Sequence, residues 1–354
     1  MANPQLAAGH HRTRSFAYVV SGTVAACAVT PVDTVSHTAG SPIVIGGGAQ
    51  SIVVTPNGKT IYVPNGVLNR VTPISTATNT ARPPIPVGGE PFAIVVTPNG
   101  RTVYVGNTSS ASVTPIRVSS NSPQADIPVG NGPARVVITP DGRTVYTVNF
   151  TDNTVTPIRV STNTAGTAIP VGGGPNSAAI TPDGKTLYVG NINDATVTPI
   201  HVPTNTAGPP IPVGKFPVAI VVTPNGKTAY VTNRDDDTVT PIHTATNTPL
   251  PAIPVGHQPF DMVVTPNGRT LYVLNSGADS VTPIRVATNT AGAPIPVPHQ
   301  PFTLAVTPDG NTLYVTGGAN LLTPIRTSTN HPGTPIVVGA SPSAIAFATI
   351  RQHS

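Results

Sequence analysis

A four-residue turn, Thr-Pro-(Asn or Asp)-Gly, recurs along this chain at a constant interval of 42 residues. The turn begins at Thr55, Thr97, Thr139, Thr181, Thr223, Thr265 and Thr307. A fixed period of this length indicates one supersecondary unit copied in tandem. The 354 residues are therefore expected to form one repeat domain rather than two unrelated domains.

Each unit contains four short segments with the composition of β-strands. In the second unit they are residues 93–97, 102–105, 112–117 and 126–130, called strands a to d, and residues 98–101 form the turn between a and b. Valine, isoleucine, threonine and tyrosine dominate these segments, as they do in strands. In the turn, proline fixes φ and glycine accepts positive φ. Four strands in about 40–45 residues are the unit of a propeller blade.

The two ends of the chain complete each other. The chain opens with strands b, c and d (16–20, 28–33 and 42–45) and finishes with a lone strand a (343–348). Pairing these fragments in one blade removes the open sheet edges, whereas a solenoid needs two capped ends. The sequence therefore predicts an all-β fold, a closed β-propeller of four-stranded antiparallel blades.

The number of blades follows from the same arithmetic. Seven complete units and one shared unit give eight blades; seven, with the terminal fragments packed differently, is the alternative. We assign residues 1–15 to an N-terminal tail, 16–349 to a single propeller domain and 350–354 to a C-terminal tail.

The composition excludes several classes of protein. Glu90 is the one glutamate and charged residues are 9% of the chain, which is too few for helical surfaces. Cys27 is the one cysteine, so neither an internal disulfide nor a cysteine-based zinc site is expected. No apolar run reaches the length of a transmembrane helix. We expect a monomer without a membrane span.

Every predicted strand c contains a proline, which is unusual for a strand inside a sheet. These prolines are Pro31, Pro73, Pro115, Pro157, Pro199, Pro241, Pro283 and Pro324. Either a bulge recurs in all blades, or the pairing of strand c with strand d starts late.

The unit also carries a recognisable motif. Residues 230–233 read Tyr-Val-Thr-Asn, near copies begin at Tyr104 and Tyr188, and Thr-Asn-Thr (78–80) and Pro-Val-Gly recur as well. Over about residues 16–349 the chain resembles the YVTN family of β-propeller repeats. The resemblance implies a bacterial or archaeal protein, often exported or at the cell surface, with a binding or scaffold role more often than an enzymatic one. The family's aspartate after strand c is kept at Asp33, but arginine or histidine replaces it in most other units.

Positions that differ between units are candidates for function, because positions that stay equal maintain the blade. The d–a loops ring one mouth of the central channel, and Lys215, His257 and His299 share one slot where most units have Gly or Ala. The predicted ligand-binding residues at this mouth are Glu90, Arg135, Lys215, His257, Asp261 and His299. If these residues bind a ligand, an anionic or metal-bridged one is favoured over a cation; solvated loop residues without a ligand are the other interpretation.

No catalytic or metal-binding motif accompanies these residues. Two histidines are fewer donors than a metal site needs, and the run 235–237 lacks a calcium loop, so we predict neither a metal nor a cofactor. Gly-x-Ser-x-Gly, His-Glu-x-x-His and phosphate-loop motifs are missing. The sequence favours a non-enzymatic propeller that recognises a partner protein or a small ligand. A channel-mouth hydrolase or lyase of the propeller lactonase type is the alternative.

The a–b turns on the other face carry one cation each in six units. They are Lys59, Arg101, Arg143, Lys185, Lys227 and Arg269. No aromatic side chains are interleaved for stacking on bases, so we expect nucleic-acid binding to be weak and electrostatic, or the ring to act only in solubility.

The N-terminal segment has two interpretations. Val24–Cys27 resembles a lipoprotein cleavage site, which would make Cys27 an acylated anchor. The rival interpretation makes residues 16–19 strand b of the shared blade, and Ser21–Thr23 interrupt the apolar stretch that a signal peptide needs. We favour the blade.

Overall fold

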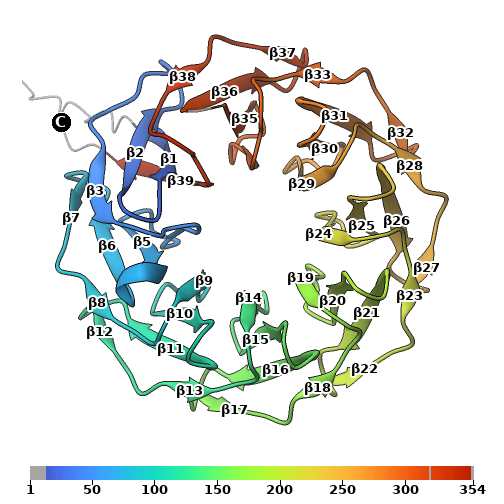
Figure 1. The fold of residues 1–354 in the computed structure, drawn as a ribbon, viewed down its shortest axis with the longest axis horizontal. Coiled ribbons are helices and arrows are strands. Elements are labelled where there is room, and N and C mark those ends of the chain that lie inside the picture. Colours follow the sequence, from blue (N-terminus) through green and yellow to red (C-terminus); the bar gives the residue numbers. More distant parts are fainter. Residues whose placement is uncertain (1–12, 319, 352–354) are drawn as a thin grey trace, which may run out of the picture.

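The computed structural model of the protein describes residues 13–318 and 320–351. They form eight antiparallel sheets arranged as a closed ring around a central channel (Figure 1). The all-β propeller and its eight blades are therefore confirmed. We number the blades 1 to 8 in chain order, with the blade shared by the two ends as blade 8.

The strands of blades 1 to 4 follow the repeat closely. Blade 1 contains β4 (Val53–Val54), β5 (Thr60–Asn65), β6 (Arg70–Ser75), β7 (Thr80–Ala81) and β8 (Ile85–Pro86), with a 3-10 turn η1 (Gly66–Leu68) between β5 and β6. Blade 2 contains β9 (Pro91–Val96), β10 (Thr102–Asn107), β11 (Ser112–Arg117), β12 (Ser122–Pro123) and β13 (Ile127–Pro128). Blade 3 contains β14 (Pro133–Ile138), β15 (Thr144–Asn149), β16 (Thr154–Arg159), β17 (Thr164–Ala165) and β18 (Ile169–Pro170). Blade 4 contains β19 (Pro175–Ile180), β20 (Thr186–Asn191), β21 (Thr196–His201), β22 (Thr206–Ala207) and β23 (Ile211–Pro212).

The remaining blades complete the ring. Blade 5 contains β24 (Pro217–Val222), β25 (Thr228–Asn233), β26 (Thr238–His243), β27 (Thr248–Pro249) and β28 (Ile253–Pro254). Blade 6 contains β29 (Pro259–Val264), β30 (Thr270–Asn275), β31 (Ser280–Arg285), β32 (Thr290–Ala291) and β33 (Ile295–Pro296). Blade 7 contains β34 (Leu304–Val306), β35 (Thr312–Gly317), β36 (Leu321–Arg326), β37 (His331–Pro332) and β38 (Ile336–Val337). Blade 8 contains β39 (Ala344–Arg351), β1 (Thr13–Gly22), β2 (Cys27–Asp33) and β3 (Ile43–Gly46).

The outermost strand differs from the sequence prediction, because in blades 1 to 7 it consists of two short pieces. In blade 2, β12 pairs with the end of β11, and β13 pairs with its start. Pro115 lies between the two pairings, and its carbonyl accepts a hydrogen bond from the Gln124 N–H at 2.8 Å. In an extended strand the N–H and C=O of one residue point to the same edge. The position where proline lacks an N–H therefore faces the gap between the two outer pieces. Because no strand pairs there, the proline removes no hydrogen bond from the sheet.

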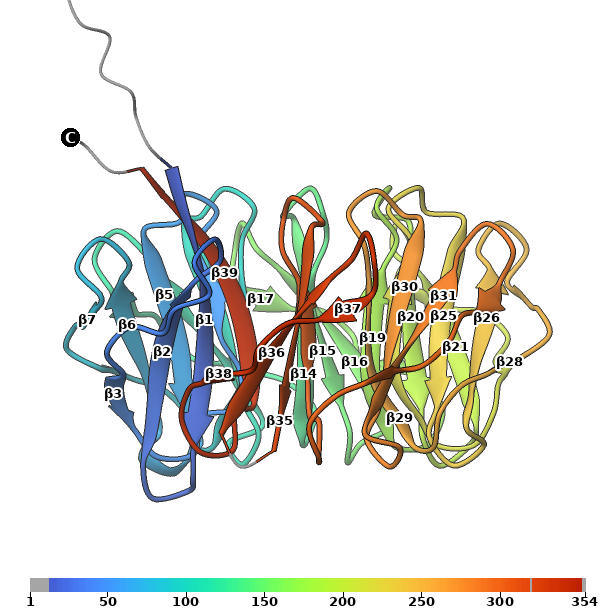
Figure 2. The same ribbon diagram turned by 90° about the horizontal axis from the view of Figure 1, so that it is seen from above.

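The two ends of the chain close the ring side by side (Figures 1 and 2). β39 pairs with β1 through eight residue pairs, from Thr13↔Arg351 to Val20↔Ala344. At the other edge of β1 lies β2, followed by β3, and Cys27 is buried as the first residue of β2. The segment from Phe16 is thus a blade strand, as favoured from the sequence.

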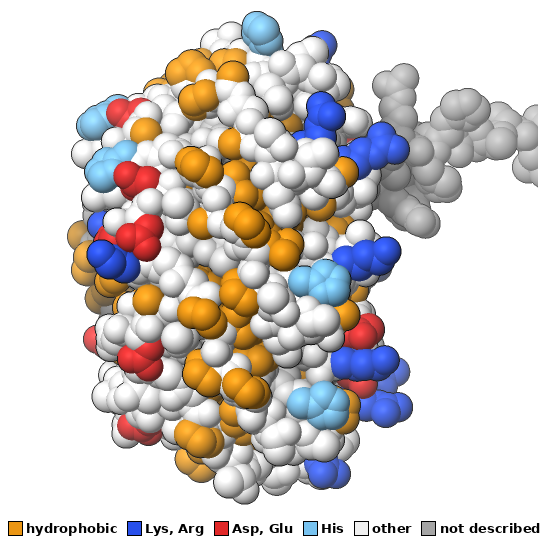
Figure 3. All heavy atoms as spheres, turned by 90° about the vertical axis from the view of Figure 1, so that its right-hand side faces the viewer, with side chains coloured by type: hydrophobic (Ala, Val, Ile, Leu, Met, Phe, Trp, Pro, Cys, Tyr) orange, Lys and Arg blue, Asp and Glu red, His pale blue; other side chains and the backbone are white. Residues whose placement is uncertain are grey.

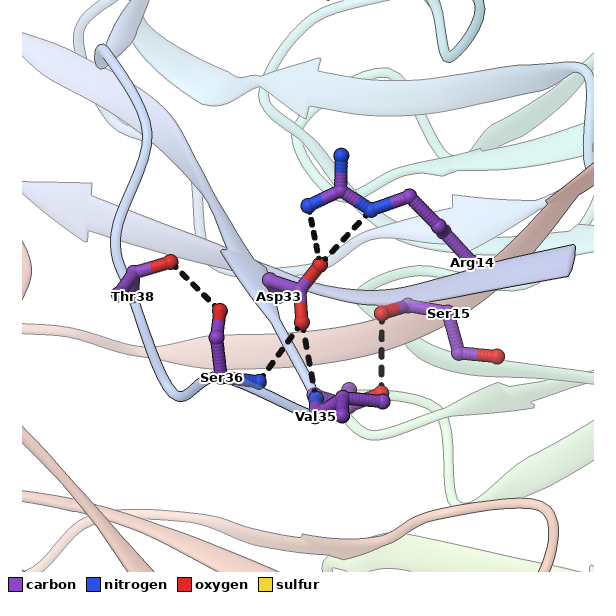
Figure 4. Close-up of polar contacts among 7 residues, drawn as sticks. Arg14, Ser15, Asp33, Val35, Ser36 and Thr38 are labelled. Carbon is purple, nitrogen blue, oxygen red and sulfur yellow. Dashed lines mark hydrogen bonds and ion pairs between the residues drawn. The ribbon is translucent and has the colours of Figure 1, made fainter. Parts of the chain in front are cut away.

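An ion pair reinforces this shared blade (Figure 4). Arg14 in β1 donates from Nε (3.0 Å) and from a terminal nitrogen (2.6 Å) to Asp33 at the end of β2. The other carboxylate oxygen of Asp33 accepts the N–H groups of Val35 and Ser36, both at 2.9 Å. Burial alone would raise the pKa of Asp33, but these hydrogen bonds and the guanidinium hold it below its usual value. The conserved-looking aspartate of the motif therefore fixes the c–d turn of the closing blade.

A repeated hydrogen bond connects each blade to the next. The buried tyrosine of strand b donates to the asparagine of the Thr-Asn-Thr turn in the following blade, as in Tyr146–Asn205 at 2.6 Å. Seven of the eight interfaces have this contact, and the eighth pairs Tyr314 with Nδ1 of His37 at 2.9 Å. Burial raises the pKa of Tyr146 to about 12, so the hydroxyl keeps the proton that it donates.

A second repeated asparagine, the last residue of strand b, is clamped inside the blade. In blade 4, Nδ2 of Asn191 donates to Thr196 and Thr198 at 3.1 and 2.9 Å. Its Oδ1 is buried without a partner, as it is in blades 1, 2, 5 and 6. Blade 3 differs, because Thr147 stands where the other blades have valine and donates to Oδ1 of Asn149 at 3.1 Å.

This difference predicts the effect of a substitution. We expect Val189→Thr to raise the free energy of unfolding by about 1 kcal/mol, because residue 189 lies on the same side of the strand as Asn191 and supplies the missing donor. Urea denaturation would measure the change. Thr147→Val should lower stability by a similar amount, and Val189→Ala is the control without a donor. A destabilised Val189→Thr variant would contradict the assignment and indicate that water already satisfies the amide.

Candidate functional site

The two faces of the ring carry different connections. The a–b and c–d turns form one face, which we call the turn face, and the b–c turns and d–a loops form the other, the loop face. Most acidic side chains lie along one rim of the molecule and most lysines and arginines along the opposite rim, while histidines are found on both (Figure 3). The candidate site lies on the loop face, where the d–a loops lead into the innermost strands.

Two histidines of this face each pair with an aspartate from the preceding b–c turn. Nδ1 of His257 lies 3.1 Å from both carboxylate oxygens of Asp237, and Nδ1 of His299 lies 2.7 Å from Asp279. Both imidazoles are exposed, at 60% and 76% of their side-chain surface. A carboxylate at Nδ1 fixes the orientation of an imidazole and leaves Nε2 available to a ligand.

The same aspartates also hold the backbone of the loops. Asp237 accepts the Gln258 N–H at 2.8 Å and Asp279 accepts the Gln300 N–H at 2.9 Å. The backbone hydrogen bond and then His257 keep the pKa of Asp237 below its usual value; for Asp279 the His299 contact is the larger cause. Both carboxylates are therefore ionised at neutral pH, which makes the two His–Asp pairs rigid parts of the loops.

Lys215 occupies the equivalent slot one loop earlier. Its N–H donates to Asp236 at 2.7 Å. Beside it, the Arg234 guanidinium lies over the ring of Phe216, 5.4 Å from the centroid, which is within the reach of a cation–π contact. The loops that enter blades 5, 6 and 7 thus carry Lys215, His257 and His299 in order, as the repeat arithmetic predicts.

A cavity opens next to His299 at the junction of blades 7, 8 and 1. Its volume is ≈ 550 Å³, and its lining includes Gln300, Phe302, Cys27 and the glycine-rich loops at 317–318 and 48–50. Phe302 is 44% exposed and packs against Phe260, with ring centroids 5.4 Å apart. The size is within the range of small-molecule sites, and the aromatic wall suits an apolar body.

Arg135 and Asp261 lie deeper, on innermost strands β14 and β29, three blades apart. Nε of Arg135 donates to the Asn176 carbonyl of the next blade at 3.1 Å. Asp261 accepts the Thr303 hydroxyl at 2.7 Å. Burial raises the pKa of Asp261, while hydrogen bonds and the charge of Arg135 act in the opposite direction. An acidic and a basic side chain therefore lie on the innermost strands of the ring.

The remaining predicted residue lies apart from this group. Glu90 is in the loop that enters blade 2, has a φ of 52° and donates its N–H to Asn69 at 2.9 Å. Five of the six predicted residues thus lie on the loops or channel wall around blades 3 to 7, and Glu90 does not join the histidines. In the described ranges, no group of three or more His, Cys, Asp or Glu side chains is placed to hold a metal ion.

The sequence analysis missed the partners that complete the group. Asp279 and the Phe260–Phe302 pair were not singled out, and the run 235–237 was interpreted only as a solvated turn. The signal for Asp237 and Asp279 was an aspartate twenty residues before each loop histidine. The cavity had no sequence signal, because it forms where the irregular loops of the two chain ends meet.

On the turn face, the six predicted cations are all exposed. Their N–H groups donate to the side chain of the asparagine or aspartate two residues earlier, as for Arg101 and Asn99 at 3.0 Å. Among residues 13–318 and 320–351, no helix has the length and apolar character needed to cross a membrane.

Comparison with known proteins gives a family and a fold. The family described as "Lactonase, 7-bladed beta-propeller" matches residues 120–215 and 204–300, which together span 120–300. No curated protein matches the sequence at a significant level.

Solved structures share the architecture at low sequence identity. Hydrazine synthase from Kuenenia stuttgartiensis is 23% identical with a TM-score of 0.65, over 79% of this chain and 96% of that chain. Dihydro-heme d1 dehydrogenase NirN, solved in complex with DHE, is 14% identical with a TM-score of 0.78, over 98% and 77%. AztD from Citrobacter koseri is 14% identical with a TM-score of 0.73, over 97% and 100%. At these identities the likeness shows the fold alone.

Proposed function

The chain belongs to the lactonase family of seven-bladed β-propellers, although its ring has eight blades, and from that membership we propose that it binds a small organic ligand at the loop-face mouth of its channel. The ligand has an apolar body and a carboxylate or carboxylic-ester end. One observation carries the proposal: a ring that otherwise repeats carries His–Asp pairs on two neighbouring d–a loops, and the second loop continues from His299 into Gln300 and Phe302, which line a cavity of ≈ 550 Å³.

The chemistry of the group favours this class of ligand. The ring of Phe302 offers an apolar contact, and Nε2 of His299 and His257 offers a hydrogen bond to an oxygen. The two histidines are not needed by the blade, because the equivalent position in other loops is glycine, as at Gly89 and Gly173. Residues that break the symmetry of a repeat without supporting it are candidates for function.

The test compares two pairs of histidines that are equally spaced in the sequence. A panel of aromatic and aliphatic carboxylates and lactones is screened by thermal shift against the wild-type protein, His257→Ala/His299→Ala, and the control His201→Ala/His243→Ala on the turn face. Both double variants should unfold within about 0.5 kcal/mol of wild type, because these side chains are exposed. Compounds that stabilise wild type and control should fail to stabilise the mouth variant. Equal stabilisation of all three proteins would place the site elsewhere.

Hydrolysis of a lactone at the same mouth is the second candidate, favoured by the His–Asp arrangement. An imidazole oriented by a carboxylate is a suitable general base for activating water. Acid release from the lactones of the panel, followed by pH-stat, tests it. Hydrolysis that His257→Ala and His299→Ala each reduce would support an enzyme; binding without acid release would support a binding protein.

A further inference from the structure

The structure separates charge between the two faces of the ring. On the turn face ten lysine and arginine side chains are exposed in addition to Arg14, which pairs with Asp33, against three exposed aspartates, Asp141, Asp183 and Asp309. The ten are Lys59, Arg101, Arg117, Arg143, Arg159, Lys185, Lys227, Arg269, Arg285 and Arg326. The loop face reverses this ratio, with seven carboxylates (Glu90, Asp152, Asp194, Asp235, Asp236, Asp237 and Asp279) against Arg70, Lys215 and Arg234. Figure 3 shows the two rims with opposite colours.

The cations of the a–b turns lie at one height. In all seven turns the glycine N–H donates to the threonine carbonyl at 2.8 Å, and the cation of six of them follows that glycine directly. Arg143 and Lys185 have an aspartate 3.7 and 3.8 Å away, which is a weak exposed pair, and the other four make no salt bridge within the described residues. Identical turns on blades of one ring present their charges in a plane, and Figure 2 shows these turns level along one side.

We propose that the turn face docks flat on an anionic lipid surface, with the channel mouth of the loop face turned away from it. A planar surface meets all the turn cations together, whereas a DNA duplex is a cylinder that reaches only a few blades at once. Among the described residues, the large exposed aromatic side chains are Phe150 and Phe302 on the loop face, so this part of the turn face presents no exposed phenylalanine or tyrosine ring to stack on bases. A large apolar side chain, Val35, is 85% exposed on this face in the c–d turn of blade 8 (Figure 4), which suits a lipid interface.

The charge separation sets both strength and orientation. Each lysine or arginine close to an anionic bilayer strengthens binding by about fivefold, so ten such side chains are sufficient without an inserted helix. The carboxylates of the loop face are repelled by the same surface, which selects one orientation. Because the attraction is electrostatic, salt weakens it. This inference does not depend on the ligand proposed for the channel mouth.

The experiment measures cosedimentation with vesicles of phosphatidylcholine containing about 30% phosphatidylglycerol, and with phosphatidylcholine alone. Arg101→Glu/Arg269→Glu reverses two turn-face charges. Lys215→Glu/Arg234→Glu is the matched control, since it reverses two loop-face charges and changes the net charge equally. All four side chains are on loops or turns, and circular dichroism melts verify that both variants fold.

Wild type and control should bind the anionic vesicles, and raising the salt from about 0.05 M to about 0.3 M should release both. The turn-face variant should bind at least about twenty-five-fold more weakly than wild type, because the loss of two cations alone has that effect and the two added carboxylates are repelled as well. The proposal is overturned if wild type does not bind, if it binds phosphatidylcholine equally, or if the control loses as much affinity. Tighter binding to duplex DNA than to vesicles at the same salt would also overturn it, in favour of a nucleic-acid partner.

Discussion

Deletion of residues 343–354 should lower the melting temperature by about 10 °C or more, because it removes the strand that closes the ring. β39 supplies eight residue pairs to β1, and the Ser343 N–H adds a hydrogen bond to the Val20 carbonyl at 2.8 Å. Without β39, the inner edge of β1 is exposed to water. The ring then has an open blade with an unpaired strand edge.

The loss extends to both neighbours of blade 8. Phe347 of β39 lies 6.1 Å from the Tyr314 ring of blade 7, and Ala348 is buried in the cluster that includes Ile61 of blade 1. Deleting the strand therefore unpacks two interfaces as well as one sheet. Thermal melts followed by circular dichroism measure the effect, with deletion of residues 352–354 as the control.

A circular permutant separates closure from chain length. Because Thr13 and Arg351 are register partners, a short turn can join them, and new ends can be cut in the a–b turn after Gly184. This protein keeps every strand and should retain the wild-type melting temperature within a few degrees. An unchanged melt after deletion of residues 343–354 would show that the ring does not depend on pairing of its ends.

The repeat predicted the architecture because its information is redundant. Seven turns at one spacing gave the blades, and the b-c-d start with the final strand a gave the shared blade and the count of eight. The outer strand was less predictable, because two-residue strands separated by an irregular stretch have no periodicity to detect. The prolines of strand c did indicate an interruption, and the structure shows that the interruption lies in the strand outside it.

The candidate site was predictable only in part. Repeat arithmetic places His257 and His299 in equivalent loops, because equal offsets in a repeat give equal positions. It does not give the contacts that a side chain makes with a neighbouring turn, so Asp237 and Asp279 were not recognised as partners. The hydrogen bond from Tyr146 to Asn205 was missed for a similar reason, because it joins residues 59 positions apart, in different units.

Gly214→Ala should be among the most destabilising single changes in the chain, at about 3 kcal/mol. Gly214 lies in the d–a loop between β23 of blade 4 and β24 of blade 5. A Cβ on this residue would lie 2.7 Å from Cβ and Cγ of Asn233. Asn233 cannot move aside, because its Nδ2 donates to Thr238 and Thr240 at 2.9 and 2.8 Å. The cost combines overpacking with the loss of hydrogen bonds from a buried amide. Urea denaturation measures it.

The chain itself contains the compensating change. In blade 7 the position of Asn233 is Gly317, and the position of Gly214 is Pro298, whose carbonyl lies 3.0 Å from where a Cβ of Gly317 would be. A larger residue is thus accommodated in the loop where the asparagine is missing. Gly214→Ala/Asn233→Gly should therefore lose less stability than the sum of the two single variants, by about 1–2 kcal/mol of coupling. Additive losses would show that the glycine is required for a reason other than the asparagine. Gly173→Ala is the control for a general effect of loop glycines, because this half-buried glycine lies in the loop between blades 3 and 4, and a Cβ there would meet only side-chain atoms of Asn193 and Asp194.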